Sequence, residues 1–342
     1  MMPNLVKRMG VVGLFLVPGL LFSEEGKVCC SHKLSGYMFG DYYYVVQNHE
    51  SLYEGQNGFW FRRIYLTYDH AISNGFSARL RFEMNSPDFT KESKSLTPFV
   101  KDAYLKWKLK KSDLLLGISP TPTWDLIEDF WGYRSVEKVP LDLQKFGTSR
   151  DLGIAIKGKV FQNELLGYHL MFANGEGDKS ENNKFKKVMA AFDFNITPFI
   201  FQVYGDWEEG EGHKDVYTYQ GFLGVKFERF KIGMQYAGQI RESEPDKRET
   251  YEIASGFFTF DIYENIAFLT RYDKMFDKSP EGISYIPFAQ AKSNFLIAGI
   301  DLRPHKDVHF IPNVEYVFYD KTDGEKPDPD LYLRLTFFYK FK

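Results

Sequence analysis

The strongest constraint on this chain is a repeated alternation of apolar and polar residues with a period of two. Residues 75–85 show it most clearly, because two sets of side chains interleave there: Phe76, Ala78, Leu80, Phe82 and Met84 against Ser77, Arg79, Arg81, Glu83 and Asn85. Successive side chains of a β-strand point to opposite faces, so one face of this strand is apolar and the other is polar and charged. A membrane barrel turns such faces to lipid and to its lumen, respectively.

The same period recurs along the rest of the chain. Clear alternation covers 152–160, 217–228 and 229–241, and weaker strands fit at 36–46, 59–70, 99–109, 113–119, 164–173, 185–195, 198–206, 250–261, 264–275, 293–303, 307–320 and from 330 to the end. The total is about sixteen, an even number of the kind that single-chain bacterial barrels use.

Connection lengths support the same architecture. Tight junctions at 73–75 and 228–229 contrast with long polar segments at 174–184, 207–215, 242–249 and 320–330. A barrel with one rim of short turns and one rim of long loops has this pattern. We therefore predict an all-β fold, a transmembrane antiparallel up-and-down β-barrel of about sixteen strands.

The C-terminus is a strand whose alternate residues are all apolar. They are Leu331, Leu333, Leu335, Phe337, Tyr339 and Phe341. A soluble protein has no use for an edge strand with so long an exposed apolar face. The ending resembles the terminal strand of bacterial outer-membrane proteins, which the barrel-insertion machinery recognises, although here Lys342 follows the last aromatic. We expect the bacterial outer membrane as the location, with its lipid and that machinery as partners.

The N-terminus has the parts of a secretory signal peptide. Lys7 and Arg8 precede an apolar stretch at 11–22, and Ser23 supplies a small residue at its end. The stretch is shorter than the roughly 20 residues of a membrane-spanning helix, so we interpret it as a cleaved signal rather than an anchor. The expected parts are a signal peptide at 1–23, a short periplasmic segment at 24–33 and one outer-membrane barrel at 34–342.

Composition agrees with a barrel and limits the partners. Aromatic residues make up 18% of the chain beside 26% charged residues, as a wall between lipid and water requires. The formal net charge is −3, and it becomes −5 once Lys7 and Arg8 leave with the signal, which argues against nucleic acid as a partner. Cys29 and Cys30 are adjacent and build no disulfide framework.

Motifs for catalysis or cofactor binding do not emerge. The sequence has no HExxH, P-loop, dinucleotide fingerprint or GxSxG. His305 and His309 are four residues apart but lie in strand-like sequence directly after Pro304, which does not form a helical zinc face. His169 is the best candidate for a catalytic partner on the lumen side, but nothing near it marks a nucleophile. We expect no enzymatic activity, no cofactor and no metal.

Charged side chains on the inner face are the candidate functional residues, because charges in a narrow lumen act on permeating ions. The alternation assigns to this face Arg79, Arg81, Glu83, Asp102, Lys106, Lys157, Lys231, Arg271 and Arg334. An alternative is that opposite charges pair across neighbouring strands and only solvate the lumen.

One connection, at 120–150, is long enough to expect a function. Its first half contains Trp124, Asp125, Glu128, Asp129, Trp131 and Arg134. Thr123 or Asp125 is placed to cap a short helix. The segment either folds inward and narrows the lumen, with its acids near Arg79, Arg81 and Lys106, or packs its aromatic residues on the outer rim.

Several motifs carry a family resemblance. They are FRRIYL at 61–66, FSARLRFE at 76–83, KDAYL at 101–105, LGI at 116–118, SRDLGI at 149–154 and KG at 157–158, with weaker ones, AGID and PNVEY, at 298–301 and 312–316. Together they resemble the phosphate-selective porins O and P and their relatives. At 119–122 the chain reads SPTP, where relatives often have a basic residue and then Pro-Phe-Gly.

The resemblance implies a sixteen-stranded porin, usually a homotrimer, that passes small hydrophilic solutes or ions by diffusion, with anions such as phosphate among them. Two other functions remain open. One is a channel for a larger or amphipathic solute that uses Trp124, Trp131 and Tyr133 as a binding track. The other is a structural or adhesive barrel with a plugged lumen.

Overall fold

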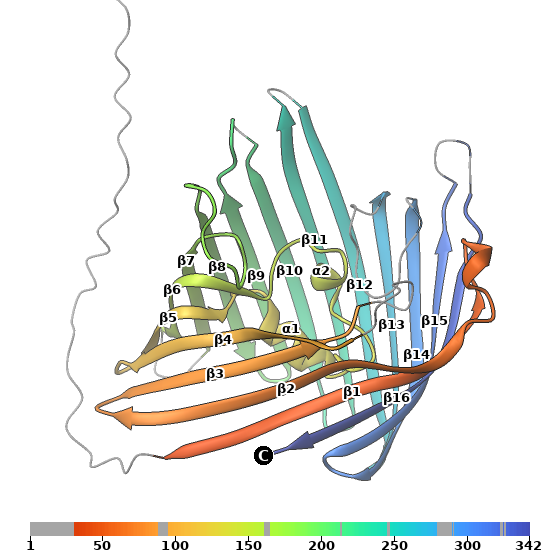
Figure 1. Cartoon of the computed structure of the whole chain (residues 1–342), viewed down its shortest axis with the longest axis horizontal. Helices are drawn as coiled ribbons and strands as arrows, with labels where there is room; N and C mark the ends of the chain where they lie inside the picture. Colours follow the sequence, from red (N-terminus) through yellow and green to blue (C-terminus); the bar gives the residue numbers. More distant parts are fainter. Residues whose placement is uncertain are drawn as a thin grey trace, which may run out of the picture.

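The computed structural model is a closed antiparallel barrel in which each strand pairs with the next and β16 returns to β1 (Figure 1). It describes residues 31–342 except 88–94, 161–164, 213, 245–246, 279–288, 290, 322–323 and 325. The expected signal peptide at 1–23 and Cys29 and Cys30 lie outside the described residues. No described helix is long and apolar enough to cross a bilayer.

The described part of the chain contains sixteen strands, as the alternation predicts. They are β1 His32–Gln47, β2 Asn57–Ser73, β3 Phe76–Asn85, β4 Thr97–Lys108, β5 Ser112–Pro120, β6 Arg150–Lys159, β7 Leu166–Ala173, β8 Lys187–Ile196, β9 Phe199–Glu208, β10 Val216–Lys226, β11 Phe230–Glu244, β12 Lys247–Tyr263, β13 Ile266–Lys278, β14 Lys292–His305, β15 Val308–Tyr319 and β16 Asp330–Phe341. Short helices are η1 Ser51–Tyr53, α1 Trp124–Trp131 and α2 Pro140–Leu143.

Short and long connections alternate around the barrel. The β2–β3 turn consists of Asn74 and Gly75, with φ angles of 49° and 79°, the left-handed pair that a two-residue hairpin turn requires. Because the strand number is even, β1 begins and β16 ends at this rim of short turns, while the long loops rise from the opposite rim (Figure 1).

The outer face is apolar, and the predicted orientation of the strands is confirmed. Leu80, Ile232 and Met234 are 37%, 43% and 56% exposed on the outer surface. Their neighbours Arg81 and Lys231 turn inward, where Arg81 bonds Thr67 and Lys231 bonds the carbonyl oxygen of Phe130. This arrangement suits an outer face in lipid and an inner face in water.

The barrel closes on a pair of glycine–aromatic contacts at the β1–β16 seam. Gly36 pairs with Phe341 and Gly40 with Phe337. A Cβ atom at position 36 would lie 2.6 Å from the Phe341 ring, and one at position 40 would lie 2.7 Å from the Phe337 ring. The rings therefore cover the bare backbone of β1, which is the known rescue of strand glycines by aromatic neighbours.

A methyl group at Gly40 tests this seam. We expect Gly40→Ala to destabilise the barrel by about 1–3 kcal/mol, the usual range for overpacking, because the new Cβ meets the Phe337 ring and the Trp60 carbonyl. Gly221→Ala is the matched control, since nothing lies within 4 Å of a Cβ built there. Denaturant midpoints of the two detergent-solubilised variants decide the matter, and equal midpoints would contradict the seam contact.

Candidate functional site: the lumen and its inner loop

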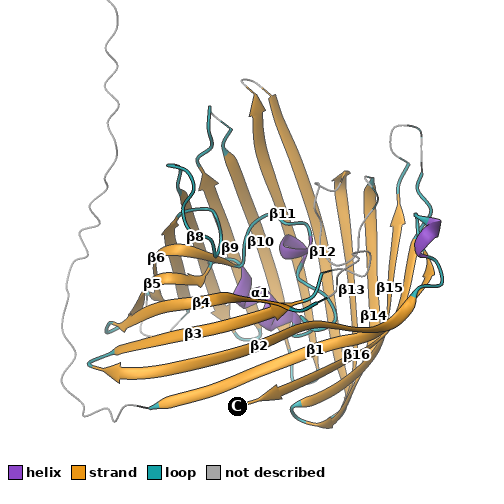
Figure 2. Ribbon diagram, viewed as in Figure 1, coloured by secondary structure: helices purple, strands orange, loops and turns teal. Residues whose placement is uncertain are grey.

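The long connection between β5 and β6, residues 121–149, lies inside the barrel and is called the inner loop below (Figure 2). Its apolar side chains join wall side chains in one buried cluster; the loop members are Trp124, Ile127, Phe130, Trp131, Tyr133, Val136, Val139, Leu141, Leu143 and Phe146. The wall members come from β1, β2 and β10–β16. The inward fold is therefore observed, and packing on the outer rim is not.

Helix α1, at the start of the inner loop, shows why the loop folds into the barrel. Trp124, Ile127 and Phe130 recur every three residues along α1, so they share one buried face. Phe130 fits between β10 and β11 because Gly224 and Gly233 leave room for it: Cβ atoms there would lie 2.5 and 2.7 Å from its ring. The helix starts directly after Thr123, which makes no side-chain cap bond, and Asp125, the other expected cap, lies within its first turn.

Wall side chains hold the backbone of the inner loop. Arg62 donates to the carbonyl oxygens of Ser135 and Val136, the latter at 2.9 Å. Arg271 donates to the carbonyl of Lys138. Gln239 donates to the carbonyl of Phe146 at 2.7 Å. Lys231 donates to the carbonyl of Phe130 at 2.6 Å. These bonds satisfy carbonyl groups that would otherwise be buried without partners.

This placement changes the role expected for several residues. Arg271 and Arg334 do point inward, but they are 1% and 4% exposed, so they face packed protein instead of open water. Trp124 and Trp131 are also buried, at 1% and 0%. A binding track made of those tryptophans is therefore excluded, because packing against the wall removes them from the lumen.

A buried ion-pair cluster joins the inner loop to the seam. Arg62 Nε lies 2.7 Å from Asp41 Oδ2, and Arg334 Nη2 lies 3.0 Å from Glu315 Oε2. The hydroxyl of Thr336 donates to Asp41 at 2.6 Å. Strands β1, β2, β15 and β16 thus meet through charges on the inside, opposite the glycine–aromatic contacts on the outside.

Four bases face the inner loop from the strands β2, β3, β4 and β6, and are called the basic wall: Arg63, Arg81, Lys101 and Arg150. Their side chains are 8–17% exposed, whereas those of their partners Glu83 and Asp102 are 1% and 0% exposed. The two predicted acids therefore lie behind the bases. The region between the basic wall and the inner loop, where charged side chains of both stay partly exposed, is called the passage below. Its wall side presents positive charge.

The ion pairs within the basic wall are close. Arg63 Nη1 lies 2.8 Å from Glu83 Oε1 and Lys101 Nζ lies 3.2 Å from Glu83 Oε2. Asp102 accepts from Arg150 and lies 3.4 Å from Arg81 Nη1. Each acid thus has two bases, which leaves the cluster with an excess of positive charge.

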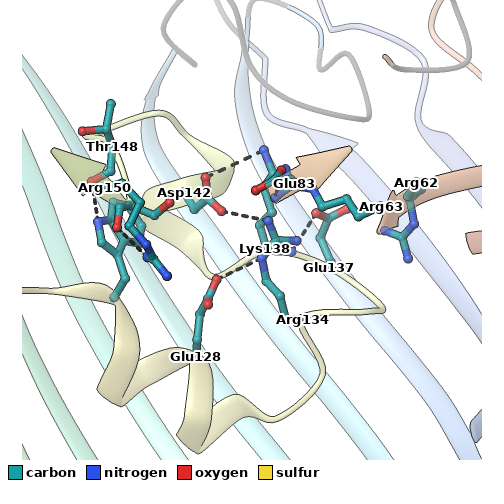
Figure 3. A network of polar contacts seen from close by, with 12 residues as sticks. Arg62, Arg63, Glu83, Glu128, Arg134, Glu137, Lys138, Asp142, Thr148 and Arg150 are labelled. Carbon is teal, nitrogen blue, oxygen red and sulfur yellow. Dashed lines mark hydrogen bonds and ion pairs between the residues drawn. The ribbon is translucent and has the colours of Figure 1, made fainter. Parts of the chain in front are cut away.

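The inner loop carries charged side chains of its own opposite the basic wall (Figure 3). Arg134 pairs with Glu128 at 2.9 Å and with Asp142 at 3.2 Å, and Lys138 lies 3.7 Å from Asp142. Glu128 and Asp142 are the more exposed members, at 28% and 20%. The loop therefore presents carboxylates toward the passage.

The pKa values of these carboxyl groups show how near the two sides are. Burial alone raises the pKa of Asp142, but Lys138 and Arg134, followed by the wall bases Arg63 and Lys101, hold it below its ordinary value. Burial raises the pKa of Glu128, and the attraction of Arg134 only partly offsets this. Asp142 therefore keeps its negative charge to a lower pH than Glu128 does.

A cavity of about 550 Å³ lies next to the β4–β5 turn and the start of the inner loop. Its charged lining consists of Lys108, Lys110, Lys111, Lys157, Lys159, Asp113, Asp125 and Asp193, together with His169. Lys157 lines the lumen as predicted. Lys159 is paired with Asp193 at 3.0 Å.

Glu128 faces the basic wall, to which Arg81 belongs, but Asp125 and Asp129 do not gather beside the bases expected for them. Asp125 lines the cavity with Lys157, and the bases that lower the pKa of Asp129 are Lys340 and Lys231, against the larger effect of burial, which raises it. Arg79 pairs instead with Asp69 at 2.7 Å, and Lys106 lies 3.9 Å from Asp113. Cross-strand pairing, the alternative for the inner charges, therefore describes most of them.

No family model matches the chain, and no curated protein does. Several solved structures do match the chain. An anion-selective porin from Comamonas acidovorans superimposes with a TM-score of 0.67 at 11% identity, covering 91% of this chain and 100% of that one. OmpT of Vibrio cholerae gives 0.65 at 10% identity, covering 93% and 100%. The channel DcaP of Acinetobacter baumannii gives 0.64 at 14%, covering 94% and 100%.

The chain has the porin fold. The similarity extends over nearly the whole length of each porin, with no large part of either chain left over.

Removing Arg62 tests how the inner loop is held. We expect Arg62→Ala to cost about 3–5 kcal/mol, because it leaves Asp41 as a buried charge without its nearest positive partner. The control Arg79→Ala breaks a half-exposed pair, which is worth at most about 1 kcal/mol. Denaturant midpoints measure the difference, and limited proteolysis should cut residues 132–139 of Arg62→Ala only. An uncut loop in a stable Arg62→Ala barrel would contradict the role of Arg62.

Proposed function

We propose that this chain is a porin of the bacterial outer membrane that passes small hydrophilic solutes and ions by passive diffusion. The observation that carries the proposal is the charged passage between the basic wall and the carboxylates of the inner loop. A plugged structural barrel has no need for charges kept at the water-facing surface of its lumen. We assign the chain no catalytic step and no cofactor.

The passage supports selectivity by charge. Bases stand on one side and loop carboxylates on the other, so an ion that enters crosses a field directed from wall to loop. Partly dehydrated surroundings strengthen such interactions relative to bulk water. The local excess of bases and the lysines of the cavity favour small anions, phosphate among them, despite the negative net charge of the chain.

The setting in the membrane follows from the outer surface and the ends of the chain. The apolar outer face fits outer-membrane lipid, the aromatic terminal strand fits the barrel-insertion machinery, and residues 1–23 fit a signal peptide. We also propose a homotrimer; the structure of Vibrio cholerae OmpT is described as a trimer form, and it superimposes with a TM-score of 0.65.

Recording currents across a planar lipid bilayer tests the channel. Purified, refolded protein should give stepwise, voltage-independent conductance, and under a salt gradient the reversal potential should show anion preference. Absence of current from correctly folded barrels would contradict the proposal and favour a plugged barrel.

Neutralising two wall bases should weaken anion preference. Lys101→Gln with Arg81→Gln leaves Glu83 with Arg63 and Asp102 with Arg150, so the fold is preserved while positive charge is lost. We expect the reversal potential to shift toward cations. Lys247→Gln, exposed at the start of β12, is the control and should leave it unchanged. An equal shift in both variants would show that the basic wall has no special role.

Neutralising the loop carboxylate should act in the opposite direction. Glu128→Gln removes the more exposed loop acid, so the reversal potential should move toward anions. The shift should shrink in about 1 M salt, where screening reduces the reach of a charge to roughly 3 Å. A shift that persists at high salt, or no shift at all, would contradict a contact between Glu128 and the permeating ion.

A further inference from the structure

A second cluster of polar groups lies away from the lumen, on the outer face at the rim of short turns. His32, the first residue of β1, and His70 of β2 are direct cross-strand partners. His32 shares its face of β1 with Leu34, which is 57% exposed, and His70 shares its face of β2 with Tyr68, which is 41% exposed. The two imidazoles therefore stand side by side on the outer surface.

Backbone geometry brings these side chains unusually close. The N–H of Ala71 donates to the carbonyl of Ser31 at 3.0 Å, so the residues next to the histidines form a hydrogen-bonded pair. His32 and His70 therefore occupy the neighbouring non-hydrogen-bonded site, where opposite side chains approach most closely. The rings are stacked, with centroids 4.6 Å apart and an interplanar angle of 13°.

Three donor atoms converge at this point. His32 Nδ1 and His70 Nδ1 are 3.1 Å apart, and the Tyr68 hydroxyl hydrogen-bonds His32 Nδ1. Two imidazole nitrogens bound to tetrahedral Zn²⁺ at 2.0–2.1 Å lie roughly 3.3 Å from each other. The observed separation of the two Nδ1 atoms thus approaches that of a chelating pair.

We propose that His32 and His70 form a binding site for a divalent transition-metal ion such as Zn²⁺. Imidazole nitrogens suit Zn²⁺, Cu²⁺ and Ni²⁺, whereas Mg²⁺ and Ca²⁺ prefer oxygen ligands. Tyr68 and water complete the coordination. The ion links the beginning of β1 to β2, so it fastens the strand that also closes the barrel against β16. This site is independent of conduction through the lumen.

A zinc titration of the full-length barrel in detergent tests the proposal. All proteins carry Cys29→Ser and Cys30→Ser, so that thiolates do not contribute to binding. Calorimetry should show one Zn²⁺ per chain, and His32→Ala or His70→Ala should each weaken binding at least tenfold. His305→Ala, which removes an exposed histidine near the same rim, should bind as the parent does.

Stability supplies the second readout. Zn²⁺ should raise the thermal transition of the parent and of His305→Ala, and it should leave His32→Ala and His70→Ala unchanged, because only the intact pair links two strands. Mg²⁺ should have no effect on any of the proteins. A parent that binds no Zn²⁺, or His32→Ala and His70→Ala variants that bind as tightly as the parent, would overturn the site.

Discussion

The apolar contact between the inner loop and one side of the barrel wall is the interaction on which the rest of the structure depends. Burial of apolar side chains contributes about 25 cal/mol per Å² removed from water, and the loop buries several large aromatic residues. A wide water-filled barrel has no such core of its own. By filling one side of the lumen, the inner loop leaves the passage between itself and the basic wall.

The core also explains why buried charges surround it. Arg62 and Arg271 bond carbonyl groups of the loop, and each arginine is in turn paired with an aspartate. Such pairs are expensive to bury and contribute more to a fixed geometry than to net stability. They fix the position of the loop, and the loop position sets the distance between Glu128 or Asp142 and the wall bases.

The alternation predicts the strand number, the facing of residues such as Leu80 and Arg81, and the inward charges. It does not predict three of the four wall bases, Arg63, Lys101 and Arg150. At Arg62 and at Lys101 the pairing skips one residue, which is a β-bulge. The bulges let Arg62 and Arg63, and likewise Lys101 and Asp102, face the same side as neighbours in sequence. In the sequence, a bulge at these positions is indicated only by two consecutive charged residues inside an otherwise alternating strand.

The sequence also does not predict the long-range contacts between the inner loop and the barrel wall. Its aromatic residues suit either a rim or a core, and nothing local distinguishes the two; Gly224 and Gly233, about a hundred residues away, supply the space that Phe130 occupies. Asp142 was also not singled out, although it pairs with two bases of the same loop, Arg134 and Lys138.

Hydrogen exchange followed by mass spectrometry tests the packed inner loop most directly. In the folded barrel, amides of 124–131 and 140–146 should exchange as slowly as those of the strands, and far more slowly than those of the external loop at 174–186. Exchange of the inner loop at the rate of that external loop, in a barrel whose strands stay protected, would contradict the account.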